Sequence, residues 1–120
     1  MQTVVVLDCP EKLLDHPHWD AVPVDVVVRR YATTNLMELL ERGRPADILV
    51  TAVLPLRREV LDYITRPKHI LVPAARGETL VEGPIAQQLG LRVHQIAGDW
   101  EDGEVFIQHL VAGIAEITGS

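Results

Sequence analysis

Cysteine, aromatic residues and long apolar runs are all scarce in this sequence of 120 residues, and each scarcity excludes a class of protein. Cys9 is the only cysteine, so an intramolecular disulfide is impossible and a reducing compartment is indicated. No apolar run approaches the ~20 residues that span a bilayer. The N-terminal segment lacks the basic and long apolar regions of a secretion signal. We therefore expect a cytoplasmic protein with no membrane contact.

Clustered positive charge is also lacking. The formal net charge is −6, and the local cationic cluster Arg57–Arg58 has Glu59 beside it, as on a solvated helix face. Nucleic acids and anionic membranes need a basic surface, so we predict no nucleic-acid partner. What is present is an apolar fraction of 48% with only 4% aromatic residues, which indicates an aliphatic core. The length predicts one domain, residues 1–120.

Short β-branched runs alternate with segments of helical spacing. The expected strands are Thr3–Leu7, Val24–Val28, Ile48–Val53, His69–Pro73 and Leu91–Ile96. The expected helices are Thr34–Arg42 with Thr33 or Thr34 as N-cap, Leu56–Ile64, Leu80–Leu89 and Glu104–Ile117, with one short helix in the first crossover. Near-continuous apolar strands are typical of a parallel sheet buried on both faces.

Five such units predict a three-layer α/β, flavodoxin-like domain. Its five-stranded parallel sheet should have the order 2-1-3-4-5, with helices on both faces. Ligands of such folds bind at the loops beyond the carboxyl ends of the strands. The candidate loops are Asp8–Glu11, Tyr31–Thr34, Val53–Leu56, Ala74–Glu78 and Ala97–Asp102.

Several functions common on this fold are disfavoured by the residues at these loops. The third strand ends in Thr51-Ala52-Val53 rather than the aspartate of a receiver domain, and the loop after the first strand has no glycine to cradle FMN phosphate. A phosphatase built on Cys9 needs an arginine where Asp15 stands, so Cys9 is interpreted as a small, half-buried structural residue.

Cofactor and metal signatures are equally weak. No glycine set forms the dinucleotide fingerprint. The five histidines are scattered, and the pair His16 and His18 has no cysteine or carboxylate at a spacing that completes a metal site. We predict no cofactor and no metal.

Most of the chain nevertheless resembles the substrate-binding domain of the D-isomer-specific 2-hydroxyacid dehydrogenases. The matching features, in order, are Ala46-Asp47, the loop and helix Pro55–Ile64, the strand Lys68–Val72, Gly77, Glu82, Ile85-Ala86 and Gly90–Val93. The tail, from Gly98-Asp99 through the last helix to Gly119, is similar to the C-terminus of that family. In the family, the nicotinamide-binding domain lies between these two parts, and here it is missing.

The resemblance implies a substrate-binding-type domain that is not catalytic by itself. Two origins of such a chain stay open: a natural stand-alone relative of the dehydrogenases, and an engineered excision from a longer one. The implied ligand is a small 2-oxo or 2-hydroxy carboxylate, bound weakly by Val53, Leu54, Pro55, Ala75, Arg76, Gly77 and Glu78.

The stretch "AARG" at Ala74–Gly77 has two interpretations. It imitates the sequence around the catalytic arginine of the family, but the spacing fits the glycine loop of the substrate domain better. In that register Gly77 matters most, because glycine permits a positive φ and a close approach of backbone N–H groups to a carboxylate. Arg76 is then an exposed neighbour that helps to attract anions.

Two alternatives stay open beside this hypothesis. The first is that the chain is a structural or interaction module that uses the surface facing the cofactor domain in the family. Such a module would be a monomer, or a dimer formed by swapping the last helix at Gly98–Gly103. The second alternative is that the chain is an independent enzyme built on Arg76, Glu78 and His94. The second is disfavoured because the histidine acid/base of the family aligns with Gln95, one residue from His94.

Overall fold

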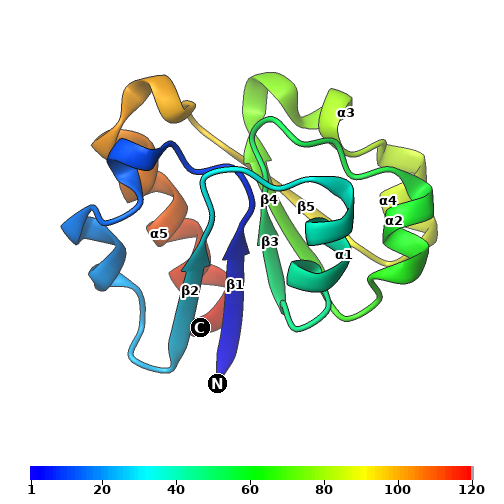
Figure 1. The fold of residues 1–120 in the computed structure, drawn as a ribbon, viewed down its shortest axis with the longest axis horizontal. Coiled ribbons are helices and arrows are strands. Elements are labelled where there is room, and N and C mark those ends of the chain that lie inside the picture. Colours follow the sequence, from blue (N-terminus) through cyan, green and yellow to red (C-terminus); the bar gives the residue numbers. More distant parts are fainter. Residues whose placement is uncertain (120) are drawn as a thin grey trace.

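The strands form one parallel sheet whose order, β2-β1-β3-β4-β5, confirms the predicted topology. A computed structural model describes residues 1–119, except for the side chain of Glu78. The strands are β1 (Gln2–Val6), β2 (Val26–Arg30), β3 (Ile48–Val50), β4 (His69–Pro73) and β5 (Arg92–Ile96). Their carboxyl ends lie together at the upper edge of Figure 1. The point where the chain order reverses, between β1 and β3, is the usual ligand crevice of such sheets.

β1 and β5 differ from the predicted bounds by one residue, and β2 and β3 differ by more. β2 runs from Val26 to Arg30 rather than from Val24 to Val28, since it pairs in register from Gln2↔Val26 to Val6↔Arg30. An edge strand tolerates these two terminal arginines because part of it faces solvent. β3 ends at Val50 instead of Val53, because the chain turns away at the next residues around a buried hydrogen-bond network described below.

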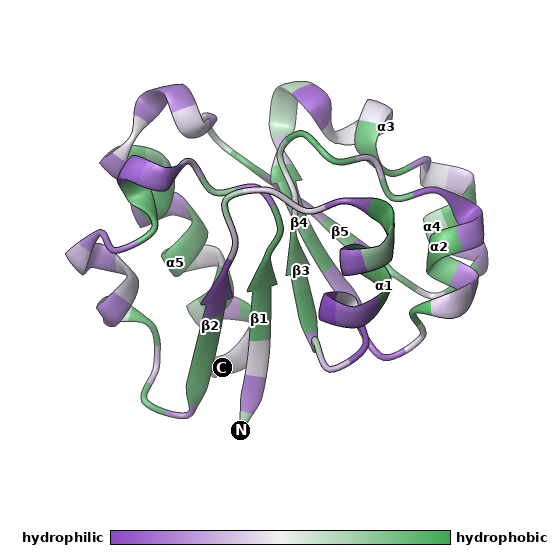
Figure 2. Cartoon of the chain, viewed as in Figure 1, coloured by the Kyte–Doolittle hydropathy of each residue, from purple (hydrophilic) through white to green (hydrophobic). Residues whose placement is uncertain are grey.

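Helices cover both faces of the sheet (Figure 1). One core lies under α1 (Leu36–Gly43), α2 (Arg58–Tyr63), α3 (Gly77–Leu80) and α4 (Gly83–Gln88). The other lies under α5 (Glu104–Gly119) and two 3-10 turns, Glu11–Leu13 and Pro17–Ala21. These turns take the place of the predicted short helix in the first crossover. The green strands of Figure 2 run between these two layers.

The bounds of the first helices differ from those that the sequence predicts. α1 begins at Leu36, and its N-cap is Asn35 rather than Thr33 or Thr34, because Asn35 and Glu38 form a reciprocal capping box. α2 is shorter at both ends than predicted. The expected single helix Leu80–Leu89 is two helices, α3 and α4, with Pro84 in the first turn of the second. Proline suits that position because a first-turn residue needs no N–H partner inside the helix.

The last helix follows the prediction closely. α5 begins at Glu104, as expected, and ends at Gly119, two residues beyond Ile117. Among residues 1–119, no helix combines the length and apolar character needed to cross a bilayer.

Candidate functional site

The loops that follow β1, β3, β4 and β5 meet at the carboxyl edge of the sheet, and the carboxylate of Asp8 lies at the centre of their hydrogen bonds. Its Oδ2 accepts from the backbone N–H groups of Val53 at 2.8 Å and Leu54 at 3.1 Å. The N–H of Ala52 contacts both carboxylate oxygens, at 3.0 and 3.1 Å. Its Oδ1 also accepts from the indole N–H of Trp100 at 3.2 Å. One carboxylate therefore joins the end of β1 to two other loops.

Thr51, the one fully buried polar residue in the described core, completes the turn. Its hydroxyl oxygen lies 3.0 Å from Asp8 Oδ2 and 2.6 Å from the carbonyl oxygen of Leu54. A hydroxyl has one hydrogen, so it donates to one of these acceptors at a time. The turn over residues 51–54 is thus held closed from inside, which explains why β3 stops at Val50.

This arrangement changes what the Val53–Pro55 loop can offer a ligand. Successive backbone N–H groups in a turn make an anion-binding concavity. Here the N–H groups of Ala52, Val53 and Leu54 are already engaged by Asp8. A ligand carboxylate would have to displace an internal one, so this loop contributes its apolar side chains rather than its donors.

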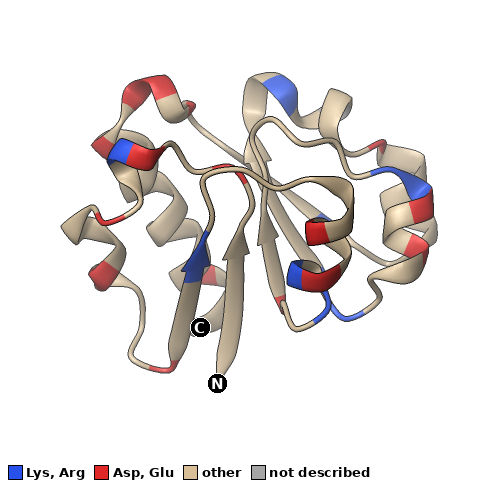
Figure 3. Cartoon of the chain, in the orientation of Figure 1, with Lys and Arg blue, Asp and Glu red and all other residues tan. Residues whose placement is uncertain are grey.

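Arg76 follows β4 in the 3-10 turn Ala74–Arg76 and connects two loops. Its Nη1 donates to the carbonyl oxygen of Ala52 at 3.0 Å, and its Nη2 lies 2.6 Å from Oδ2 of Asp99. The side chain is 41% exposed, so the arginine predicted as an exposed neighbour is half-buried and already paired with an acid. Figure 3 shows acidic residues gathered on the turn before α5, where Asp99 belongs.

Asp99 also shapes the turn that it belongs to. Its Oδ1 accepts from the N–H of Trp100 at 2.7 Å, while its own N–H donates to Oδ2 of Asp102 at 3.0 Å. Asp99 is therefore the N-cap of the turn Trp100–Asp102 and the partner of Arg76 at once. The two oxygens of the carboxylate serve these two roles separately.

Gly77 does not have the conformation that the sequence suggested. Its φ is −52° and its ψ is −48°, which is ordinary helical geometry, so the predicted positive φ is wrong. A side chain would be crowded instead: a Cβ at Gly77 would lie 3.1 Å from Nε2 of Gln95 and 3.4 Å from Cγ2 of Val72. The glycine allows the start of α3 to sit close against β4 and β5.

A cavity of about 470 Å³ opens at the crevice between β1 and β3. It is lined by Asp8, Ala32, Thr33, Thr34, Val53, Leu54 and Pro55. Val53 is 61% exposed beside it, and Leu36 and Met37 at the start of α1 are exposed as well. The carboxyl edge thus carries apolar side chains that nothing in residues 1–119 covers.

The predicted site residues are only partly brought together. Val53, Leu54 and Pro55 line the cavity, and Arg76 reaches their loop through Ala52. Ala75 is exposed in the neighbouring turn, and the side chain of Glu78 lies outside the described residues. Sequence reasoning missed Asp8 and Asp99, although both stand in loops that it had marked. Their roles depend on partners far away in the sequence, which no local pattern reveals.

His94 does not join this group. It lies on the face of the sheet that α5 partly covers, where its Nε2 is 3.0 Å from Nδ1 of His69. Gln95, the residue that aligns with the family's histidine, packs against Gly77. An enzyme assembled from Arg76, Glu78 and His94 therefore gains no support from the geometry.

Cys9 has the environment of a structural residue. It is fully buried, and burial raises the pKa of its thiol to about 11, with Asp8 adding to the rise and Arg30 opposing it. The reactive thiolate is thus disfavoured at neutral pH. Within residues 1–119, no group of three or more histidines, cysteines or carboxylates converges in a way that could hold a metal ion.

Comparison of the sequence finds no matching protein-family model and no matching curated protein. Comparison of the fold finds dehydrogenases. A Ralstonia solanacearum protein assigned as a D-3-phosphoglycerate dehydrogenase matches 82% of this chain with a TM-score of 0.70 and 17% identity. A phosphoglycerate oxidoreductase from Vibrio cholerae gives a TM-score of 0.64 over 82% of the chain at 19% identity. D-2-hydroxyisocaproate dehydrogenase gives 0.62 over 81% at 10% identity.

The matched regions are only part of those enzymes. They cover 31%, 32% and 30% of the three chains, respectively, so this chain corresponds to about a third of their length. The resemblance seen in the sequence is confirmed at the level of the fold, which is that of one domain in the D-2-hydroxyacid dehydrogenases.

Proposed function

We propose that this chain is a substrate-binding-type domain that has no catalytic activity by itself and binds small 2-oxo or 2-hydroxy carboxylates weakly. The ligand would sit at the carboxyl edge of the sheet, between Arg76 and the Val53–Pro55 loop. The fold shared with one third of several dehydrogenases supports this proposal. Hydride transfer needs a bound nicotinamide held against the substrate, and the sequence has no dinucleotide fingerprint.

The observation that carries the proposal is the position of the Arg76 guanidinium. It is held between the Ala52 carbonyl and Asp99, and Ala52 directly precedes the Val53–Pro55 loop that lines the apolar cavity. A guanidinium recognises a carboxylate through paired N–H donors, and the cavity would take a short apolar substituent. Because Asp99 already occupies one edge of the guanidinium, a ligand carboxylate must compete with it. Affinity should therefore be millimolar or weaker, ~4 kcal/mol or less.

Titration with pyruvate or glyoxylate, followed by amide NMR, tests the proposal. We expect saturable shifts at Ala52–Leu54 and Arg76–Gly77 in the wild-type chain, and their loss in Arg76→Gln. Lys68→Gln is the matched control, since Lys68 is exposed just before β4, at the opposite edge of the sheet, and its replacement also removes one positive charge. Shifts that are absent from the wild type, or unchanged in Arg76→Gln, would remove the binding claim.

A second function is favoured by the apolar side chains at the same edge. Val53 is 61%, Leu36 60% and Met37 73% exposed, and exposed apolar patches mark surfaces that associate. The chain would then self-associate or pair with a separate partner through this edge. Sedimentation velocity at increasing concentration tests self-association, which we expect Val53→Glu to weaken and Val105→Glu, on α5, to leave unchanged. A concentration-independent monomer would leave only the separate partner.

A further inference from the structure

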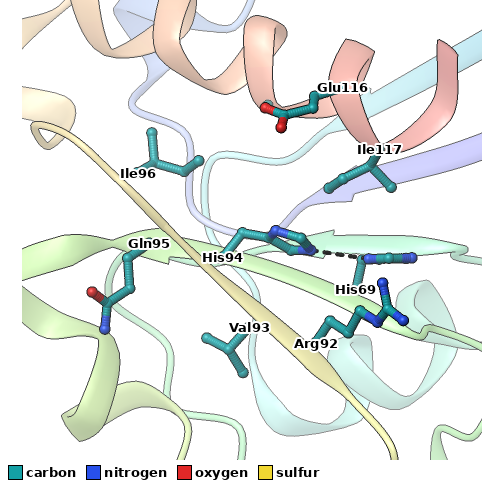
Figure 4. Close-up of a pocket in the computed structure, with 9 residues that line it drawn as sticks. His69, Arg92, Val93, His94, Gln95, Ile96, Glu116 and Ile117 are labelled. Carbon is teal, nitrogen blue, oxygen red and sulfur yellow. Dashed lines mark hydrogen bonds between the residues drawn. The ribbon is translucent and has the colours of Figure 1, made fainter. Parts of the chain in front are cut away.

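A second cavity, which is polar unlike the first, lies away from the carboxyl edge, on the face of the sheet that α5 partly covers. Its volume is about 580 Å³, and its wall is formed by the β5 strand, by His69 on β4, and by Gly113, Glu116 and Ile117 on α5. Figure 4 shows the rings of His69 and His94 side by side in the wall of this cavity, with Glu116 above them and Arg92 below. The carboxyl-edge function uses none of these side chains.

The two imidazoles approach closely and share one contact. Nδ1 of His69 is 3.0 Å from Nε2 of His94, the ring centroids are 5.2 Å apart, and the ring planes differ by 28°. Such a contact needs one nitrogen to donate and the other to accept, so at least one of these two nitrogens presents a lone pair. Burial lowers the pKa of both histidines; nearby Arg92 lowers both further, and Glu116 opposes the shift at His94. Both rings are therefore biased toward the neutral form that binds metals.

The separation of these nitrogens suits one bound cation. Two zinc–nitrogen bonds of about 2.0–2.1 Å that meet near a tetrahedral angle place the nitrogens about 3.3 Å apart. The observed 3.0 Å is close to that value, and the cavity beside the rings leaves them room to turn their lone pairs toward a common point. Imidazole is a preferred ligand of zinc, copper and nickel ions.

We propose that His69 and His94 bind one divalent late transition metal ion, such as Zn²⁺, with solvent in the remaining positions and the Glu116 carboxylate as the neighbouring counter-charge. The hydrogen now shared by the two rings would move to the other nitrogen of its own ring, so that both facing nitrogens present lone pairs to the ion. Two histidines and solvent make an open site rather than a closed structural one. It is distinct from the carboxyl-edge site, because His69 and Arg92 begin their strands, at the opposite edge of the sheet.

Calorimetric titration of the whole chain with Zn²⁺ at neutral pH tests the proposal. We expect one ion per chain, with affinity falling by roughly tenfold or more in His69→Asn and in His94→Asn. The double variant His16→Asn/His18→Asn is the control, because that pair is the other histidine cluster in the sequence and should not contribute. In NMR, Zn²⁺ should shift the ring protons of His69 and His94 together.

Two charge variants test whether the bound ligand is a cation. Glu116→Gln should weaken Zn²⁺ binding, and Arg92→Gln should strengthen it, because a cation gains from the acid and loses from the base. The affinity should also fall in acid, since protons compete for the imidazole nitrogens. The fall should come at a pH below the usual imidazole pKa, because the pKa of both histidines is lowered. Binding that survives His69→Asn and His94→Asn, binding lost in the control, opposite effects of the two charge variants, or no binding at all would each overturn the proposal.

Discussion

Trp100 donates its indole N–H to the Asp8 carboxylate at 3.2 Å, across 92 positions of sequence. The same indole packs edge-on against Phe106, with ring centroids 4.9 Å apart. The first strand and the last helix are thus tied together at the carboxyl edge by one polar contact and one aromatic contact. Through Asp8, the end of β1 is joined to the loop after β3 and to the turn before α5.

Replacing Asp8 by Asn should destabilise the protein. The amide keeps one acceptor oxygen but turns an NH₂ group toward the N–H donors of residues 52–54. Hydrogen bonds to a charged acceptor contribute about 1.5–3 kcal/mol, so we expect a loss of about 2–3 kcal/mol in the free energy of unfolding. Urea denaturation measures it. Asp15→Asn is the control, because Asp15 is exposed. Equal stability of the two variants would show that the network contributes little.

The turn before α5 should be sensitive to a side chain at Gly98. This glycine has a φ of +95°, and a Cβ there would lie 2.8 Å from Oδ2 of Asp102. Left-handed geometry costs a residue with a side chain roughly 1–2 kcal/mol, and the close contact disturbs the cap formed with Asp99. Gly98→Ala should therefore lower the thermal midpoint clearly. Gly83→Ala, where no atom lies within 4 Å of the added Cβ, should leave it nearly unchanged. Similar midpoints would contradict this account of the turn.

Asp47 should make stability depend on pH in the acid range. Burial raises the pKa of this carboxyl, but the N–H of Thr3 and the nearby Arg66 together lower it below its usual value of 3.8. A carboxyl with a lowered folded-state pKa stabilises the fold above its unfolded pKa, and that contribution is lost as the pH falls through the folded value. Asp47→Asn should thus cost about 1–2 kcal/mol at neutral pH and little in strong acid.

Unfolding by urea at a series of pH values tests the dependence on Asp47. Asp25→Asn, at an exposed position, should run parallel to the wild type throughout. A constant difference between Asp47→Asn and the wild type down to strong acid would mean that the effect of the substitution is not electrostatic.

The fold could be predicted because its signals are local and repeated. Runs such as Thr3–Leu7 and His69–Pro73 are apolar on both faces, and the alternation with helical segments restricts the topology to very few choices. The start of α1 was misplaced although its signal is visible, since Asn35 and Glu38 have the spacing of a capping box. Pro84 similarly marks the first turn of α4 and could have divided the predicted helix.

The candidate site was harder to predict because its contacts are distant in sequence. Asp8 meets Val53 and Trp100 only after the sheet has formed, and Arg76 meets Asp99 through loops of two different strands. The sequence singles out Gly77 for its backbone freedom, but its φ of −52° is ordinary and its close packing is what a side chain would disturb. Backbone freedom is a local property, whereas the packing of Gln95 and Val72 against Gly77 is a tertiary one.

The affinity of Asp99→Asn for pyruvate, relative to the wild type, tests the central claim most directly. Asparagine keeps the oxygen that caps the Trp100 turn but removes the charge paired with Arg76. Glu101→Gln is the control, since it removes one exposed acid from the same turn. We predict roughly tenfold tighter binding in Asp99→Asn, a gain of about 1.4 kcal/mol, and no gain in Glu101→Gln. Equal affinity in Asp99→Asn and the wild type would show that Asp99 does not hold Arg76 against a ligand.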